Sequence, residues 1–115
     1  MNSIDELKIA MRSFAEARDW DQFHSPKNLS MALAGEAGEL LECFQWLTEE
    51  QSSKLSEKQL LAVADEIADI QLYLIRLADK LELDIFAECN RKIAVNAEKY
   101  PIDKSKGKSD KYTDI

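Results

Sequence analysis

Apolar residues recur every three or four positions along most of the chain, with polar residues between them. An α-helix turns by about 100° per residue, so this spacing gathers apolar side chains on one helical face. No stretch alternates as a strand does, and only three glycines and two prolines interrupt the pattern. The pattern therefore predicts an all-α protein with short connections between its helices.

Start and stop signals divide the pattern into four helices. Each predicted helix begins just after a side chain that can cap its free N–H groups, and Glu6 could close a capping box with the first of these. The fourth helix should stop before Pro101, because the residue ahead of a proline avoids helical geometry. The capping residues are Ser3, Ser25, Ser56 and Asp84. The predicted helices span about 3–18, 26–47, 56–81 and 85–99.

Between and after the helices, polar or irregular stretches predict connections. Residues 19–24 join the first two helices, and residues 48–59 read as a polar turn. The segment after Pro101 is charged and lacks periodicity, which predicts a disordered or loosely docked tail. We expect residues 1–100 to form a four-helix bundle domain and residues 101–115 to form the tail.

Two of the predicted helices carry acids beside their apolar face. On the second helix Glu36 borders the stripe of apolar residues, and Glu39 lies about 60° further round. On the third helix Glu66 and Asp69 occupy the same positions relative to their stripe. When the two apolar faces meet, the four carboxylates can therefore converge along one edge.

Converging carboxylates repel one another, and a divalent cation removes that repulsion. Ligation by oxygen alone favours hard ions such as Mg²⁺ or Mn²⁺. Di-iron bundles and zinc hydrolases need histidine or cysteine ligands in patterns that this chain, with His24 as its one histidine, does not contain. The alternative is that both acid pairs are solvated flanks of their helices.

Composition narrows the functional classes. A chain of 115 residues with 45% hydrophobic residues forms one globular domain, and a net charge of −7 disfavours binding to nucleic acid or to anionic lipid. No apolar run reaches the roughly 20 residues of a membrane span, and the start, MNSIDELKI, lacks the layout of a signal peptide. We therefore expect a cytoplasmic protein in which Cys43 and Cys89 are reduced, buried thiols.

Four segments resemble a known family. They read RDWDQFHSPKN, GEAGELLECFQW, DEIADIQLYL and NRKIAVNAEKYP. In this order they resemble the MazG-like all-α nucleoside triphosphate pyrophosphohydrolases, most closely their dCTP pyrophosphatase branch, over about residues 14–101. The resemblance implies a helical bundle shared between subunits, with a tetramer favoured over a dimer. It also implies hydrolysis of a (deoxy)nucleoside triphosphate to the monophosphate and pyrophosphate.

The same resemblance implies roles for individual residues. Mg²⁺, which Mn²⁺ could replace, would be held by Glu36, Glu39, Glu66 and Asp69, and Glu39 would also be the general base. The nucleotide would be contacted by six side chains. Trp20 and Trp46 would sandwich the base, His24 and Tyr73 would line the pocket, and Lys92 and Asn96 would reach phosphate or sugar.

Taken without the resemblance, some of these six residues allow simpler interpretations. Trp46 lies off the apolar stripe, where it could stack on a base or fill a subunit interface. Trp20 could be a lid over the end of the bundle, and His24 a hydrogen-bonded loop residue. The rival function is an oligomeric helical interaction module without catalysis. Among substrates, dCTP and its modified forms come first, with dATP and non-standard nucleotides as alternatives.

Overall fold

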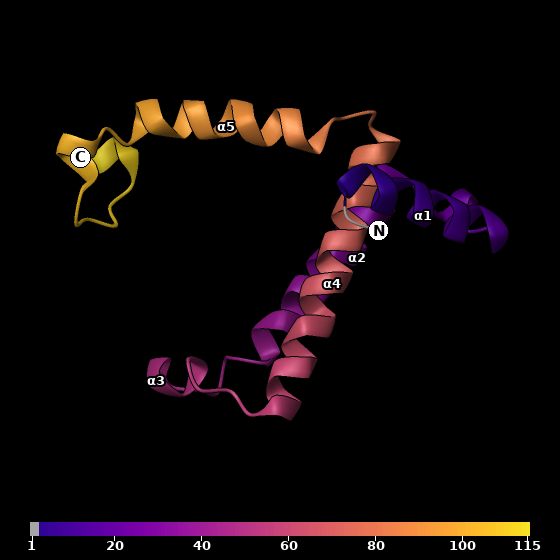
Figure 1. Cartoon of the computed structure of the whole chain (residues 1–115), viewed down its shortest axis with the longest axis horizontal. Coiled ribbons are helices and arrows are strands. Elements are labelled where there is room, and N and C mark those ends of the chain that lie inside the picture. Colours follow the sequence, from indigo (N-terminus) through magenta and orange to yellow (C-terminus); the bar gives the residue numbers. More distant parts are fainter. Residues whose placement is uncertain (1–2) are drawn as a thin grey trace. The chain divides into compact units, whose positions relative to one another are not determined.

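The computed structural model describes residues 3–115, and every regular element among them is helical (Figure 1). The all-α prediction is therefore confirmed. None of these helices has the length and apolar character needed to cross a bilayer. The elements are α1 (Ile4–Ala17), η1 (Asp21–Phe23), α2 (Pro26–Glu42), α3 (Glu49–Ser52), α4 (Glu57–Lys80), α5 (Ile85–Lys99), α6 (Ile102–Ser105) and η2 (Tyr112–Asp114).

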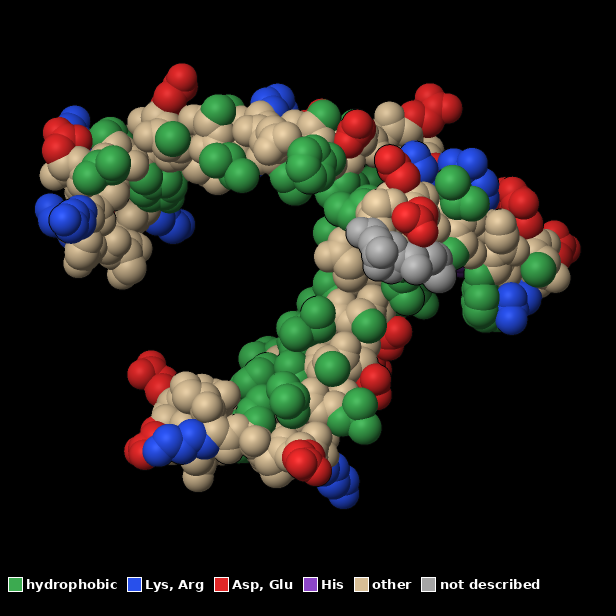
Figure 2. All heavy atoms as spheres, in the orientation of Figure 1, with side chains coloured by type: hydrophobic (Ala, Val, Ile, Leu, Met, Phe, Trp, Pro, Cys, Tyr) green, Lys and Arg blue, Asp and Glu red, His purple; other side chains and the backbone are tan. Residues whose placement is uncertain are grey.

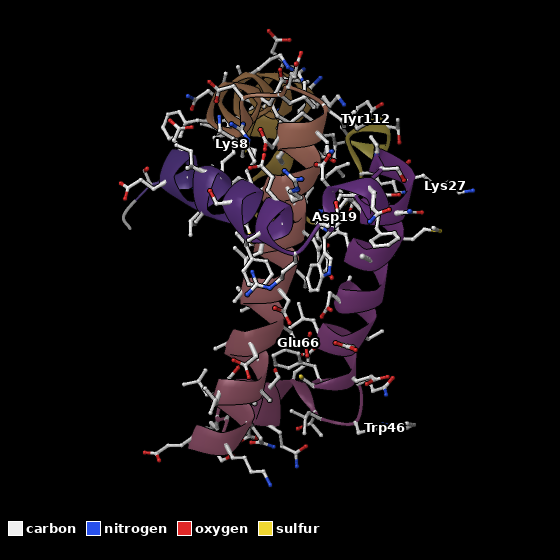
Figure 3. All side chains as sticks on the ribbon, turned by 90° about the vertical axis from the view of Figure 1, so that its right-hand side faces the viewer. Lys8, Asp19, Lys27, Trp46, Glu66 and Tyr112 are labelled. Atoms are coloured by element: carbon white, nitrogen blue, oxygen red, sulfur yellow. The ribbon has the colours of Figure 1, made fainter. Side chains whose placement is uncertain are left out.

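The chain divides into two compact units, one ending at Glu82 and the other covering Leu83–Ile115. In the first unit α2 packs along α4, and α1 packs against α4 as well (Figures 1 and 3). Apolar side chains from all three helices are buried between them. The buried apolar residues are Ala15, Leu29, Val63, Ile75 and Ala78.

The predicted helix starts are all found. The side chains of Ser3, Ser25, Ser56 and Asp84 each accept a hydrogen bond from the backbone N–H three residues later. Ser56 also forms a complete capping box with Gln59. At the first helix the expected box is incomplete, because the Glu6 carboxylate accepts from the Ser3 hydroxyl rather than from the Ser3 backbone N–H.

The prediction for the end of the second helix was wrong. The helix α2 ends at Glu42 instead of Leu47, because the amides of Cys43 and Phe44 bond to carbonyls three residues back and tighten the chain into turns. Thr48 then caps the short helix α3 with a capping box, an element that the polar sequence of this connector did not predict. The position off the apolar stripe that was predicted for Trp46 assumed a helix to Leu47, and it therefore does not apply.

The apolar stripe predicted on the third helix is only partly covered. Val63 is buried, but Ile67 is 55% exposed and Leu74 is 40% exposed. Burial on α4 is instead concentrated towards its C-terminal end. Both cysteines are free thiols, but Cys43 is half-buried and Cys89 is exposed, so the expectation that both are buried was wrong.

The second unit contains α5 and a tail with more local structure than the sequence predicted. After Pro101 the chain forms α6 and η2. The Tyr112 ring contacts the Tyr100 ring edge to face at 6.1 Å, and the Lys99 ammonium lies 4.8 Å from the Tyr112 ring centre. These contacts join the tail to the end of α5.

A backbone feature at the end of α4 gives a first prediction. Glu82 adopts the left-handed conformation, with φ of 55°, directly after the helix. Glycine adopts this conformation without the steric cost that a side chain brings. We expect Glu82→Gly to raise the free energy of unfolding by about 0.5–1 kcal/mol. Urea denaturation would measure this, and Glu82→Ala should give no such gain.

Candidate metal and nucleotide site

Three acids from two helices come together in the first unit. Glu36 and Glu39 project from α2, and Glu66 projects from α4. Each offers a carboxylate oxygen, and these oxygens all lie within 4.8 Å of one another. Figure 3 shows the Glu66 side chain between the two paired helices. The matched positions of the acids on the two helices therefore produce a real cluster.

Asp69 lies on α4 one turn beyond Glu66 but outside this cluster. Its side chain is exposed. Its negative charge nevertheless contributes to raising the pKa of Glu36 and that of Glu66. Of the four predicted metal ligands, Asp69 is therefore the one that lies near the cluster without belonging to it.

The electrostatics of the cluster favour a bound proton or cation. The hydrogen bond to Glu66, burial and the neighbouring Glu39 raise the pKa of Glu36 to about 7. The hydrogen bond to Glu36 lowers the pKa of Glu66, but burial and the charge of Glu39 outweigh it, so this pKa is also raised. Glu36 and Glu66 therefore hold a proton that isolated carboxylates would have released near neutral pH.

The donor atoms suit a hard divalent cation. When both carboxyls are ionised, Oε2 of Glu36 and Oε2 of Glu66 are buried without a hydrogen-bond partner among the described residues. An unpartnered buried carboxylate oxygen is costly, and a cation would satisfy it. All three groups of the cluster are carboxylates, the ligands that Mg²⁺ and Mn²⁺ prefer.

These pKa shifts predict how stability changes with pH. Because the folded protein holds the Glu36 proton more tightly than the unfolded chain, the metal-free protein should lose stability as pH rises from about 4.5 to about 7. We expect Mg²⁺ to raise the melting temperature at pH 7.5 and to have little effect at pH 5, where protons compete for the same oxygens. Differential scanning fluorimetry at the two pH values measures this. An equal rise at both would contradict it.

In the connector after α1, Trp20 is held in place by contacts with the end of that helix. Asp19 adopts the left-handed conformation, with φ of 55°, and the Trp20 backbone N–H donates to the Ala15 carbonyl at 2.9 Å. This pattern closes the helix end and turns the chain back over it. The Trp20 ring packs edge to face on Phe14 at 5.7 Å and on His24 at 6.5 Å.

A buried arginine, Arg76, ties this connector to α4. Its side chain is 2% exposed, and its guanidinium donates to Nδ1 of His24 at 3.1 Å and to Oδ1 of Asp21 at 2.6 Å. The same Asp21 oxygen accepts from Lys80 at 2.5 Å. The third partner of the guanidinium is Oδ2 of Asp79, at 3.3 Å.

The sequence pattern did not predict this network. Arg12 on α1 extends it by donating two hydrogen bonds to Asp79, at 2.6 and 3.1 Å. The available signal was Arg76 itself, a charged residue inside the apolar run LYLIRLA. The network connects α1, the connector of residues 19–24 and α4. It therefore positions His24, and with it Trp20, which packs on the His24 ring.

The other predicted site residues occupy different surroundings. Tyr73 is half-buried on α4. Trp46 is 86% exposed in the turn after α2, and Figure 3 shows its side chain projecting outward. Lys92 and Asn96 are exposed on α5, in the second unit.

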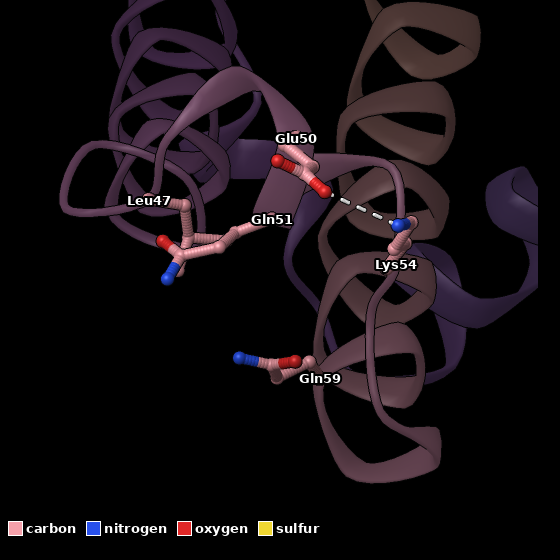
Figure 4. Close-up of a pocket in the computed structure, with 5 residues that line it drawn as sticks. All are labelled: Leu47, Glu50, Gln51, Lys54 and Gln59. Atoms are coloured by element: carbon pink, nitrogen blue, oxygen red, sulfur yellow. Dashed lines mark hydrogen bonds and ion pairs between the residues drawn. The ribbon is translucent and has the colours of Figure 1, made fainter.

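A separate hollow lies beside α3 (Figure 4). It contains none of the predicted site residues, and the Glu50 carboxylate that lines it is paired with Lys54 at 3.2 Å. Because its charges are already paired, it offers no free cation for a phosphate. Its lining residues are Leu47, Glu50, Gln51, Lys54 and Gln59.

Comparisons with known proteins place the chain among relatives of known class. Residues 32–115 match the model of the MazG-like family. The chain is 37% identical to dCTP pyrophosphatase 1 of Bos taurus and 35% identical to that of Homo sapiens, over 98% of this chain and 68% of each relative. A pyrophosphatase from Archaeoglobus fulgidus has a similar structure, with a TM-score of 0.80, 37% sequence identity and coverage of 84% of this chain and 91% of that one. The family match continues to residue 115, beyond the segments that carried the resemblance.

Proposed function

The chain belongs to the MazG-like family and is a nucleoside triphosphate pyrophosphohydrolase, and we propose that it hydrolyses dCTP or a modified form of dCTP with the help of Mg²⁺. The products would be the monophosphate and pyrophosphate. Such an activity would remove unwanted nucleotides from the pool. The observation that carries this proposal is the cluster of Glu36, Glu39 and Glu66, with its two unpartnered buried oxygens.

The cluster would hold the metal ion. Glu36, Glu39 and Glu66 would be ligands, and Asp69 would join them from the next turn of α4. When bound, Mg²⁺ neutralises charge on phosphate oxygens and lowers the pKa of a bound water. Glu39 is the exposed member of the cluster, and we assign to it the removal of a proton from the attacking water.

The nucleoside end would meet the aromatic residues. Trp20 is held by the end of α1 next to His24, and Tyr73 lies one turn beyond Asp69 on α4. Trp46 exposes an aromatic face that could stack on a base. Lys92 and Asn96 would reach the phosphates or the sugar from α5.

Hydrophobic side chains are visible on the surface of both units (Figure 2), and this exposure supports a larger assembly. Ile67 and Leu74 on α4 are exposed, and Phe86 and Ile93 on α5 are 71% and 67% exposed. A soluble protein rarely leaves so many large apolar side chains in water. We therefore propose that the four long helices form a bundle whose apolar faces are completed by other copies of the chain, with a tetramer favoured over a dimer.

A nucleotide screen tests the proposed function. Purified protein would be incubated with each canonical deoxynucleoside triphosphate and with modified dCTP, with and without Mg²⁺, and pyrophosphate would be measured. We expect release to be fastest with dCTP or a modified form and to require the metal ion. If no triphosphate were cleaved, the rival interpretation, an interaction module without catalysis, would replace the enzyme.

A further inference from the structure

We propose that Arg76 is a positioning residue that holds the His24 imidazole with its proton on Nε2, so that Nε2–H donates a hydrogen bond to the nucleoside part of the substrate. This inference rests on the proposed function for its substrate, but the arrangement of the two side chains can be tested without any nucleotide. It gives a role to a buried charge that no step at the carboxylate cluster requires.

The direction of the Arg76–His24 hydrogen bond fixes the tautomer. A guanidinium has five N–H donors and no acceptor, and it stays charged at all accessible pH values. Since Nε of Arg76 lies 3.1 Å from Nδ1 of His24, Nδ1 must accept, and the ring proton must be on Nε2. None of the hydrogen bonds among the described residues involves Nε2. That N–H group can therefore donate to a bound molecule.

The surroundings keep the guanidinium in this orientation. Arg76 is 2% exposed, and its other nitrogens are held by Asp21 and Asp79, so rotation away from His24 would break several charged hydrogen bonds. Burial, together with the positive charges of Arg76 and Lys80, lowers the pKa of His24. The imidazole is therefore neutral at physiological pH, in agreement with an accepting Nδ1.

The position of Arg76 on α4 relates His24 to the acids. Arg76 follows Asp69 by seven residues, which places it on the same helical edge about 10 Å further along the axis. His24 lies outside the group of clustered ligand atoms around Glu36. With phosphates at the acids, the imidazole beside Trp20 would face the nucleoside end.

Nuclear magnetic resonance of the metal-free, nucleotide-free protein tests the tautomer directly. His24 is the only histidine in the chain, so ¹⁵N-histidine labelling gives a single imidazole to observe. We expect an unprotonated, hydrogen-bonded Nδ1 and a protonated Nε2. In Arg76→Met, the pKa of His24 should rise, because a cation is lost while Asp21 remains. In Lys80→Met, a matched loss of positive charge, the Nδ1 hydrogen bond should persist. A proton on Nδ1 in the wild-type protein would overturn the proposal.

Two substitutions of His24 test the donor while the buried arginine keeps its bonds to Asp21 and Asp79. A glutamine amide can place an N–H group near the position of Nε2, whereas asparagine reaches only the position of Nδ1. We expect His24→Asn to raise KM roughly tenfold with a smaller change in kcat, as for the loss of one hydrogen bond. His24→Gln should restore part of that loss.

Arg76→Met combined with His24→Asn should cost no more than His24→Asn alone, because both changes remove the same donor. Equal KM values for the Gln and Asn variants would refute hydrogen-bond donation from the Nε2 position. Additive losses in the double variant would refute the role of Arg76. If no nucleotide were hydrolysed at all, the proposed function would fail, while the imidazole spectrum would still decide the Arg76–His24 arrangement.

Discussion

Glu39→Gln should lower the rate of pyrophosphate release from dCTP by roughly 1,000-fold, the range expected when a general base is lost. Glutamine keeps the size of the side chain but can neither accept the proton of the attacking water nor supply a charged metal ligand. Steady-state kinetics at saturating Mg²⁺ would measure the loss. The reduction should appear in kcat, because the change acts on the reacting water rather than on the nucleoside.

The same helix offers a matched control. Glu42 follows Glu39 by three residues, is exposed, and lies outside the carboxylate cluster. Glu42→Gln should therefore keep wild-type activity. Without metal, Glu39→Gln should be at least as thermally stable as the wild-type protein, because it removes one of the charges that raise the pKa of Glu36. Activity close to wild type in Glu39→Gln would favour the interaction module.

Local sequence patterns were sufficient to predict the long helices and the convergence of three of the four acids, Asp69 lying outside the cluster. Capping side chains mark helix starts because their hydrogen bonds reach only three residues along the chain. Helix geometry predicted that Glu36 and Glu66 lie close together, because both acids border an apolar stripe and the two stripes pack together. These features depend on spacing within a single element, which a sequence displays directly.

The features that the sequence did not predict depend on competition between a helix and a turn, or on partners that are far apart in the sequence. The apolar pattern continues past Glu42, but the chain tightens into turns there and restarts at the Thr48 cap. Arg76 interrupts an apolar run, and its partners Asp21 and His24 are 55 and 52 residues away. No local pattern encodes such pairing, so a buried arginine cannot be distinguished from a surface one until the helices are packed.

Asp79→Asn should lower the free energy of unfolding by about 3 kcal/mol, the cost typical of removing one partner from a buried ion pair. The Asp79 side chain is 10% exposed and binds Arg12 with both oxygens while also accepting from Arg76. An asparagine amide would turn one acceptor into a donor that faces a guanidinium. Arg76 would then remain buried with Asp21 as its one carboxylate partner.

Urea denaturation at a fixed protein concentration measures the change, and a surface pair supplies the comparison. Glu50 and Lys54 form an ion pair whose side chains are 80% and 74% exposed, so Glu50→Gln should cost less than about 0.5 kcal/mol. Equal losses in the two variants would show that the network around Asp79 contributes no more than a solvated contact.

The dependence on pH separates lost charge from lost packing. The hydrogen bonds from Arg12 lower the pKa of Asp79 below its ordinary value of 3.8. A carboxylate whose folded pKa is depressed contributes stability above its unfolded pKa, and this contribution is lost as pH falls through the folded pKa. The difference between wild type and Asp79→Asn should therefore be constant near neutral pH and shrink below about pH 3.8. A difference that persisted undiminished in acid would mean that the substitution acts through packing and not through the charge that binds α1 to α4.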